Sequence, residues 1–422
     1  MSSSSPVIRL ACTSQSYDWG KLGPESKVAE LASAVPGFTS DANTPYAELW
    51  MGTHPNGPSQ TLDATPKPLK SLLNEQNLGM KIYKEYAGDL PFLFKVLSIR
   101  KALSIQAHPD KTLAADLHKR FPDVYKDPNH KPEMAVALTP FEAFINFRPL
   151  NEIVAHLKEF TEFRTIVGDE TAAAFEAQAA KASAGSVDEN KKVLKSLFQK
   201  VMESKQELIT QQLDTLITRI QSQGLAKKGG LYELVDRLNT QFHADVGTFC
   251  AFLLNYVKLS PGESIFLAAN EPHAYLSGDC VECMAASDNV IRSGLTPKFK
   301  DVDTLVNCLT YNYGPADTQI LRGESYKATK HTTLYDPPIQ EFSILRTSLD
   351  GDTKEHIDAI HGPSIFIVTD GQGSLEYSHA AGKKDSVNVQ TGHIFFIAAG
   401  TPITLTGGSG KKPFTSYRAF CA

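Results

Sequence analysis

The sequence predicts a mainly β protein with a helical insertion, in which antiparallel domains are closed or sandwiched in the jelly-roll manner. Three observations support this class. Short apolar runs broken by Pro and Gly fill residues 46–147, Ala-, Lys-, Gln-, Glu- and Leu-rich sequence fills residues 151–245, and two short segments about 130 residues apart share one pattern. The first texture is typical of strands, the second of helices, and the repeat indicates two related β modules.

Length, charge and cysteine usage limit the possible functions. A chain of 422 residues exceeds the roughly 250 residues that one core usually supports, so more than one domain is expected. The net charge of -5, without a long Lys or Arg block, argues against nucleic acid or an anionic membrane as a partner. No secretory signal and no membrane-spanning apolar stretch are visible, so we expect a cytoplasmic protein whose six cysteines are free.

Residues 46–147 are expected to be mainly strands, because apolar runs such as 90–97 are too short for long helices. Residues 151–245 are expected to be a helical insertion. It ends near Gly229-Gly230, and strand-like sequence returns after Lys258. Within the insertion, apolar residues recur at roughly helical spacing, namely Val193, Leu197, Val201, Leu208, Leu213, Leu216 and Ile220.

The internal repeat relates residues 261–273 to residues 391–403. Each copy has a turn glycine, an apolar strand, a small-residue bend and a proline at the same offset. The alignment places His273 opposite Ile403. If the first module binds a metal through His273, the second module is therefore expected to lack that metal.

Five polar residues have the spacing of a metal site. Gln106 and His108 lie two residues apart, as do Lys131 and Glu133, so each pair is expected to share one face if its segment is a strand. With His273, they offer two imidazoles, one carboxylate and one carboxamide, a donor set that suits zinc and tolerates other divalent ions. A Gln-x-His pair is also common without a metal.

Other residues compete for metal binding. His54, His130, His243 and the histidines near the C-terminus are alternative ligands, and Cys280 with Cys283 has the spacing of half a zinc site. Because no second Cys or His pair accompanies these two thiols, we expect them to be reduced and free of metal.

Basic residues accompany the candidate ligands. Lys95 lies on an apolar strand, Lys131 precedes Glu133 by two residues, and Arg292 and Lys298 follow His273. Such cations match a phosphate or sugar-phosphate anion. Lys95 has apolar neighbours on both sides and needs an interior partner, whereas Lys298 can equally be a solvated surface cation.

Several longer motifs, taken together, point to one protein family more specifically than any single motif does. The chain resembles type I phosphomannose isomerases of eukaryotes essentially from end to end, with minor departures such as Ser293. The resemblance rests on 15–21 (QSYDWGK), 47–55 (AELWMGTHP), 91–97 (PFLFKVL), 103–109 (LSIQAHP), 129–134 (NHKPEM), 270–275 (NEPHAY), 278–284 (GDCVECM) and 294–298 (GLTPK).

The resemblance implies a cupin fold with one metal site. It implies a catalytic cupin barrel formed by residues 1–150 and 251–325, a helical domain at 151–250 inserted into it, and a second, metal-free barrel at 326–422. It implies one Zn²⁺ per chain, held by Gln106, His108, Glu133 and His273. The implied catalytic residues are Arg292, Lys131 and Glu282, and the implied substrate-binding residues are Ser104, Lys95, Tyr275, Lys298, Trp19 and Glu48.

The resemblance also implies a function. The expected reaction interconverts mannose 6-phosphate and fructose 6-phosphate through an enediol(ate), and links glycolysis to the mannose activation that supplies GDP-mannose and glycosylation. Lys131 and Glu282 are both candidates for moving the proton between C2 and C1. The expected partner is a small sugar phosphate, and the expected state is a monomer.

Two other classes of protein stay open on the residues alone. Two histidines and one carboxylate also suit a ferrous dioxygenase, although Gln106 and the cations argue against it. A sugar-phosphate sensor without turnover is the second alternative, and it leaves the combination of a metal with buried cations poorly explained.

Overall fold

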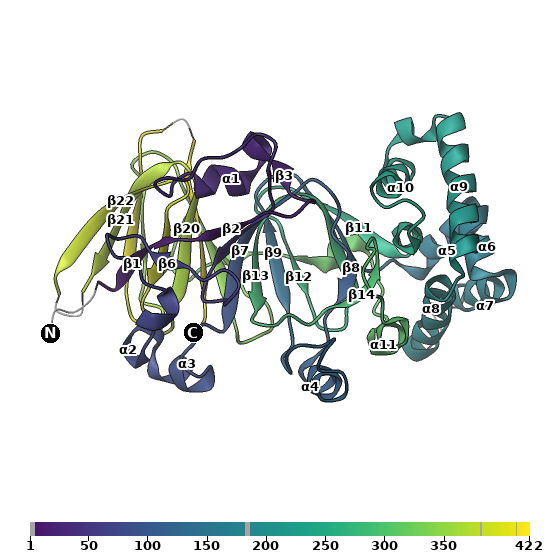
Figure 1. Ribbon diagram of the computed structural model, residues 1–422, viewed down its shortest axis with the longest axis horizontal. Coiled ribbons are helices and arrows are strands. Elements are labelled where there is room, and N and C mark those ends of the chain that lie inside the picture. The colour runs from purple at the N-terminus through teal and green to yellow at the C-terminus, as the bar shows by residue number, and fades with distance from the viewer. Residues whose placement is uncertain (1–4, 182–185, 380–381, 411) are drawn as a thin grey trace.

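A computed structural model describes residues 5–181, 186–379, 382–410 and 412–422. Two β barrels and a helical domain follow one another along its long axis (Figure 1). The predicted class, mainly β with an inserted helical domain, is confirmed. None of the helices in the described residues is long and apolar enough to cross a membrane.

The first barrel uses chain from both sides of the helical domain. Its eleven hydrogen-bonded strands are β2 (Thr13–Gln15), β5 (Glu48–Met51), β7 (Phe92–Ile99), β8 (Ile105–Ala107), β9 (Glu133–Ala137), β10 (Phe141–Phe147), β11 (Leu254–Leu259), β12 (Ser264–Leu267), β13 (His273–Ala285), β14 (Ile291–Gly294) and β15 (Ile320–Leu321). A separate two-stranded sheet joins β3 (Lys21–Leu22) to β4 (Pro45–Tyr46).

The long strand β13 joins both faces of this barrel. Its first half pairs with β8 and β10, and its second half pairs with β7 and β9. The two halves meet at Gly278, whose φ is 106°. A Cβ at this position would lie 2.4 Å from the carbonyl oxygen of Pro140, so only glycine fits the bend.

Strand alternation decides which side chains enter the first barrel. Leu97 and Ile99 pack inside with Ala135 and Ala137, whereas Val96 and its alternating neighbours pack between the two barrels. Lys95 and Glu133 follow the interior alternation on β7 and β9. Charged groups are thereby carried into an otherwise apolar interior.

The C-terminal barrel packs an eight-stranded sheet against a four-stranded sheet. The larger sheet contains β1 (Val7–Ala11), β6 (Gln60–Thr61), β16 (Glu324–Ser325), β17 (Thr332–Tyr335), β18 (Ser343–Leu349), β20 (Ser364–Asp370), β23 (Ile394–Ile397) and β25 (Phe414–Phe420). The smaller contains β19 (Lys354–Ile357), β21 (Gln372–Ser378), β22 (Lys384–Gln390) and β24 (Ile403–Gly407).

The N-terminal strand contributes to the second barrel. β1 pairs with β23 on one side and with β6 on the other. This pairing was not predicted, because two strands that pair across more than 380 residues leave no local signal in the sequence. The domain limits at 150, 250 and 325 remain predictions.

The internal repeat is matched residue by residue in the backbone. β12 and β23 begin at equivalent places, and His273 and Ile403 are the first residues of β13 and β24. Gly262 and Gly392 have φ values of 91° and 84°, and Asn270 and Gly400 have φ values of 61° and 75°. The two segments therefore use the same turns, which confirms the predicted pair of related modules.

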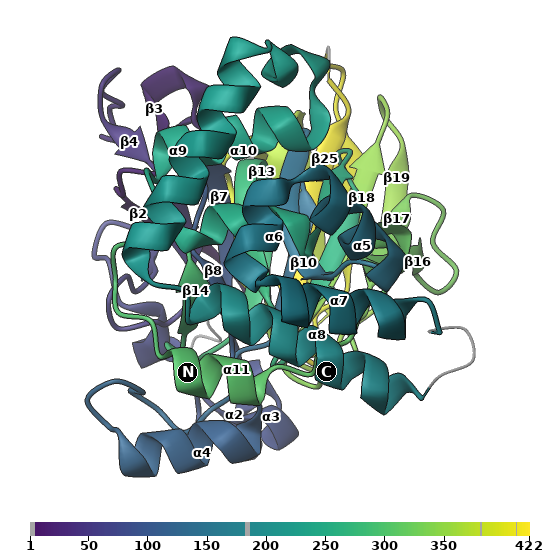
Figure 2. The same cartoon turned by 90° about the vertical axis from the view of Figure 1, so that its right-hand side faces the viewer.

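The helical domain covers the end of the first barrel, and in Figure 2 its helices lie in front of the strands. It contains α5 (Leu150–Glu159), α6 (Thr161–Val167), α7 (Asp169–Ala179), α8 (Val187–Met202), α9 (Gln206–Ser222) and α10 (Gly230–Gln241). Leu197 and Val201 of α8 and Leu213 and Leu216 of α9 are buried in one core, as their spacing predicted.

Short helices also lie outside the insertion. These are α1 (Lys27–Ala32), α2 (Glu75–Leu78), α3 (Met80–Glu85), α4 (Lys111–Arg120) and α11 (Val302–Cys308). The expectation that residues 46–147 are mainly strands missed three helices in this range, α2, α3 and the longer α4. Asp110 starts this helix, since its carboxylate accepts from the backbone N–H of Leu113.

Candidate active site

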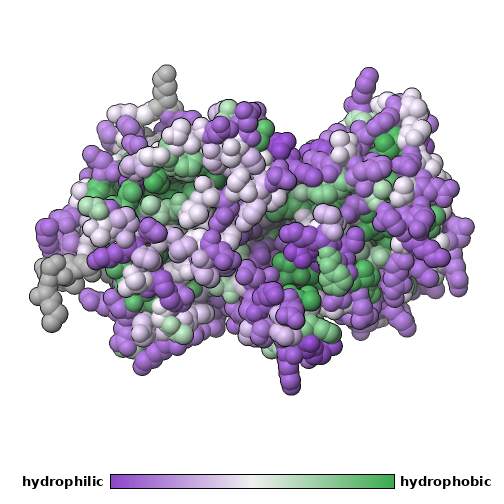
Figure 3. All heavy atoms as spheres, viewed as in Figure 1, coloured by the Kyte–Doolittle hydropathy of each residue, from purple (hydrophilic) through white to green (hydrophobic). Residues whose placement is uncertain are grey.

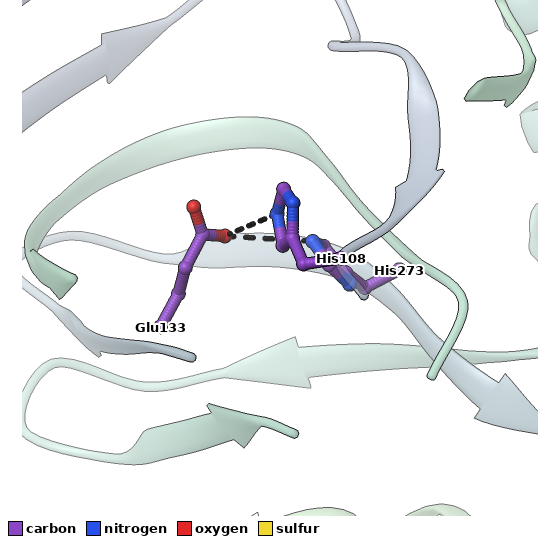
Figure 4. A group of neighbouring side chains, drawn as sticks. All are labelled: His108, Glu133 and His273. Carbon is purple, nitrogen blue, oxygen red and sulfur yellow. Dashed lines mark ion pairs between the residues drawn. The ribbon is translucent and has the colours of Figure 1, made fainter. Parts of the chain in front are cut away.

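Three predicted metal ligands converge inside the first barrel. His108 follows β8, Glu133 begins β9 and His273 begins β13. One Glu133 oxygen, Oε2, lies 3.4 Å from Nε2 of His108 and 3.4 Å from Nε2 of His273 (Figure 4). All three side chains are at most 3% exposed, and the three residues are grouped closely enough to hold one metal ion.

Backbone carbonyls fix the orientation of both imidazoles. Nδ1 of His108 lies 2.7 Å from the carbonyl oxygen of Asn289, and Nδ1 of His273 lies 3.0 Å from that of Glu271. A carbonyl only accepts, so each Nδ1 carries the proton and each Nε2 presents a lone pair. Neither Nε2 has a hydrogen-bond partner among the described residues. Two buried lone pairs directed at one carboxylate fit a divalent cation.

Gln106 lies beside this group. The register pairs Gln106 of β8 with His273 of β13 and with Arg292 of β14. Directly paired residues of antiparallel strands present their side chains on the same face. Arg292, Gln106 and His273 therefore form one row across three strands, and Oε1 of Gln106 also accepts from Ser104 Oγ at 3.4 Å.

A pocket of about 340 Å³ opens next to this row. It brings together seven of the predicted site residues, which are far apart in the sequence. These are Trp19, Glu48, Ser104, Gln106, Lys131, Arg292 and Lys298. A cavity of this size, with several polar and cationic groups in its wall, suits a small polar ligand.

The guanidinium of Arg292 is not neutralised within the described chain. It makes no ion pair there, and burial alone lowers its pKa from the ordinary value. By contrast, Lys131 Nζ lies 3.0 Å from Glu133 Oε1. Arg292 is thus a guanidinium of the pocket wall that is available to an anionic ligand, and Lys298 of the same wall likewise has no ion pair among the described residues.

Lys95 has the interior partners that its position requires. Its Nζ lies 3.4 Å from Glu48 Oε2 and 3.3 Å from Glu282 Oε2, and 5.2 Å from the centre of the Trp50 ring. Burial disfavours the charged form, but the carboxylates of Glu48 and Glu282 outweigh it, so the pKa of Lys95 is raised. Lys95 remains a cation inside the barrel.

The pKa values of the two central carboxylates, Glu133 and Glu282, are shifted in opposite directions. Burial alone would raise the pKa of Glu133, but Lys131 and then His108 hold it well below the ordinary value. Burial also raises the pKa of Glu282, and there it exceeds the lowering effect of Lys95. For His108, burial lowers the pKa to about 4, so its ring is neutral near pH 7.

Three predicted site residues lie behind the pocket wall. Lys95, Glu282 and Tyr275 are buried and do not line the pocket. Burial, followed by the charge of Glu282, raises the pKa of Tyr275 well above its ordinary value. The roles predicted for these residues toward a substrate remain predictions.

The thiols are separated from the metal site and from one another. All six cysteines are free, as expected. Cys280 packs inside the first barrel, whereas Cys283 packs between the barrels. Residues three apart on a strand point to opposite faces, so these two thiols do not form half a zinc site.

The sequence analysis missed part of the pocket. Phe242, which follows α10, and Lys101 line it, and Lys101 Nζ lies 4.3 Å from the centre of the Phe242 ring. The helical domain therefore supplies part of the wall. It is held there by Asp245, whose carboxylate accepts from the backbone N–H groups of Leu295 at 2.6 Å and Thr296 at 3.2 Å. No local pattern predicts such contacts between domains.

Comparison with known proteins identifies the family. Residues 7–150 match the catalytic domain of type I phosphomannose isomerases, residues 166–254 their helical insertion domain, and residues 333–380 their C-terminal part. The chain is also 47% identical to mannose-6-phosphate isomerase of Schizosaccharomyces pombe, over 98% of this chain and 100% of that protein. The chain belongs to the type I phosphomannose isomerase family.

Other family members give the same result. The mannose-6-phosphate isomerase of Saccharomyces cerevisiae is 45% identical, with 99% of both chains covered. An alanine variant of phosphomannose isomerase from Salmonella typhimurium superposes with a TM-score of 0.81 at 29% identity, over 99% of this chain and 100% of that one. A zinc-bound mannose 6-phosphate isomerase gives 0.80 at 29% identity and the same coverage.

Proposed function

We propose that this phosphomannose isomerase family member is a zinc-dependent aldose-ketose isomerase that interconverts D-mannose 6-phosphate and D-fructose 6-phosphate through an enediol(ate). The observation that carries this proposal is the pair of unpartnered imidazole nitrogens, each 3.4 Å from Glu133. Gln106, which pairs with His273 across the sheet, and Lys131, which pairs with Glu133, line a pocket whose wall also contains Arg292 and Lys298. Full-length relatives in fungi are named as this isomerase.

The donor set of this chain fits zinc. Nε2 of His108, Nε2 of His273 and a Glu133 oxygen would hold the ion together with the carboxamide of Gln106. When bound, zinc supplies Lewis-acid stabilisation of negative charge that develops on a sugar oxygen.

The chain's own cations handle the anionic parts of the substrate. Arg292 is the uncommitted guanidinium of the wall, and it can bind phosphate or stabilise a developing oxyanion through its fixed fork of N–H donors. Ser104, Lys298, Trp19 and Glu48 line the same cavity. These side chains would orient an opened hexose so that its C1 and C2 face Lys131.

Two residues can move the proton between C2 and C1. Lys131 lines the pocket, so its Nζ can reach a bound sugar directly, and it can take up the proton only as the neutral amine, a form that burial or the nearby zinc ion would have to favour. Glu282 lies deeper, paired with Lys95, but its raised pKa brings it closer to the working range of a general base. The position of Lys131 favours it as the group in contact with substrate.

We also propose that the protein works as a cytoplasmic monomer, with no nucleic acid or membrane partner, and supplies mannose units for GDP-mannose and glycosylation. Six free thiols suit a reducing compartment. The exposed large apolar residues include Met80 on α3, Val187 on α8 and Phe299, which belong to separate segments. The face seen in Figure 3 is largely hydrophilic, as expected of a surface without an obligate partner.

A coupled assay tests the proposed reaction. The protein is incubated with mannose 6-phosphate, and fructose 6-phosphate is detected as it forms, while oxygen uptake is followed in a parallel sample with ferrous iron. We expect isomerisation without oxygen uptake. Oxygen uptake without isomerisation would indicate a dioxygenase, and sugar-phosphate binding without turnover would indicate a sensor.

A further inference from the structure

The C-terminal barrel directs one buried carboxylate toward the first barrel. Glu341 lies in the loop 336–342 that joins β17 to β18, and the residue is 4% exposed. Its Oε1 lies 2.6 Å from Nε2 of His130 and 3.3 Å from Nζ of Lys111. A carboxylate only accepts, so Nε2 of His130 donates. One carboxylate thus joins two segments of the other barrel.

The two segments that Glu341 joins both carry proposed metal ligands. Lys111 comes three residues after His108, and His130 comes three residues before Glu133. His130 also directly precedes Lys131, which lines the pocket and pairs with Glu133 at 3.0 Å. A displacement of either segment therefore moves a ligand, and a displacement of the second also moves Lys131.

Contacts within the first barrel hold the backbone of Asn129, whereas Glu341 of the other barrel holds the side chain of His130. On the side of the first barrel, the carbonyl oxygen of Asn129 accepts from Asn289 Nδ2 at 3.0 Å and from Ser287 Oγ at 3.1 Å. These bonds hold the beginning of the segment 129–133 against the loop 286–290, which joins β13 to β14. The side chain of His130 instead reaches out of its own barrel, and its carboxylate partner belongs to the other barrel.

We propose that Glu341 is a positioning residue for the active site, through which the C-terminal barrel fixes the spacing of the segments 108–111 and 130–133. The inference rests on the proposed function and gives the second barrel a part in it. Through these segments Glu341 sets the distance between His108 and Glu133 and the placement of Lys131. The carboxylate touches neither the substrate pocket nor the proposed ligands.

Glu341→Gln tests this role, because it keeps the shape of the side chain and removes its charge. We expect the variant to release zinc to a chelator roughly tenfold faster than the wild type, the lower end of the range for removing a hydrogen-bond partner of a metal ligand, because Glu341 acts one contact further from the ligands. We expect kcat to fall by a similar factor, with KM within about twofold, because the interactions lost are not those that bind ground-state substrate.

A matched control separates this role from a general loss of stability. Glu162 of α6 is also buried, and its carboxylate pairs with Arg219 at 2.8 and 2.9 Å within the helical domain. Glu162→Gln therefore removes a similar buried charge away from the site, and it should leave zinc release and kcat unchanged. Both variants are compared at a temperature at which each is fully folded.

Two outcomes would overturn the inference. One is zinc release and kcat in Glu341→Gln equal to the wild type, and the other is an equal change in Glu162→Gln. If Glu341→Gln does not fold, His130→Asn and Lys111→Met remove the partners from the other side and must show the same faster zinc release. A wild type that neither binds zinc nor isomerises the sugar would instead contradict the proposed function.

Discussion

At the scale of single residues, Nε2 of His108 and Nε2 of His273 are buried lone pairs that no described protein group satisfies. Leaving such atoms without a partner costs about 1–3 kcal/mol each, so a bound cation explains their arrangement. The spacing of Gln106 and His108 predicted a shared face, but only the fold shows that His273 and Glu133 meet there.

His273→Ala tests the ligand set. The substitution removes one of two imidazole donors, so we expect stoichiometric zinc to be lost, together with activity. Metal content is measured by elemental analysis of the purified variant. Cys280→Ser and Cys283→Ser are the controls, and their zinc content should equal that of the wild type. Retained zinc and activity in His273→Ala would remove this histidine from the proposed site.

Arg292→Ala tests the unpaired guanidinium of the pocket wall. The residue makes no ion pair within the described chain, so its removal should leave the melting temperature unchanged. We expect kcat to fall about a hundredfold, the usual effect of removing one preorganised donor to a developing charge. Steady-state kinetics and thermal melting of the same sample measure both effects. Activity close to that of the wild type would refute the role proposed for Arg292.

Arg418 of β25 is a buried guanidinium outside the proposed site. It is 2% exposed, none of its three nitrogens has a partner among the described residues, and burial lowers its pKa to about 10. An apolar side chain of similar length avoids the cost of desolvating a charge. We therefore expect the free energy of unfolding of Arg418→Met to be within about 1 kcal/mol of the wild-type value or higher than it. Denaturant unfolding measures the difference. A loss above about 3 kcal/mol would reveal a partner that this account lacks.

At the scale of elements, repeated sequence predicted repeated structure. The two copies at 261–273 and 391–403 share their turns and their strand starts, because glycine, proline and alternating apolar residues act over a few positions. Contacts that join distant elements were not predictable in this way. The pairing of β1 with β23, the place of Phe242 in the pocket and the reach of Glu341 to His130 depend on how domains pack.

The contact between Arg9 of β1 and His393, which directly precedes β23, makes the free energy of unfolding depend on pH. Nδ1 of His393 accepts from Arg9 at 2.7 Å, and burial, followed by the charge of Arg9, lowers the pKa of His393 to about 4. The unfolded chain takes up this proton near pH 6.5. Between these values the unfolded state binds more protons than the folded state, so stability falls as the pH drops from about 6.5 to about 4.

His393→Gln removes this titration. We expect its melting temperature to fall less than that of the wild type over the same pH interval. Thermal melts at closely spaced pH values measure the difference. Parallel curves for His393→Gln and the wild type would contradict the assignment.

At the scale of the whole molecule, three parts of the chain meet around the proposed site. The first barrel supplies the proposed ligands, the helical domain adds Phe242 to the pocket wall, and the C-terminal barrel contacts the ligand-bearing segments through Glu341. The family motifs predicted the reaction and seven residues of the pocket wall, whereas others, such as Phe242 and Lys101, were not predicted. Which part supplies the proposed ligands, which adds to the pocket wall and which contacts the ligand-bearing segments became visible only in the fold.

The most direct test of the account is a zinc titration of the chelated protein. Isomerisation of mannose 6-phosphate and bound zinc are measured on the same samples as the ion is returned. We predict that chelation abolishes turnover and that activity rises in proportion to zinc, up to one ion per chain. Full activity in a folded preparation without bound metal would contradict the central claim.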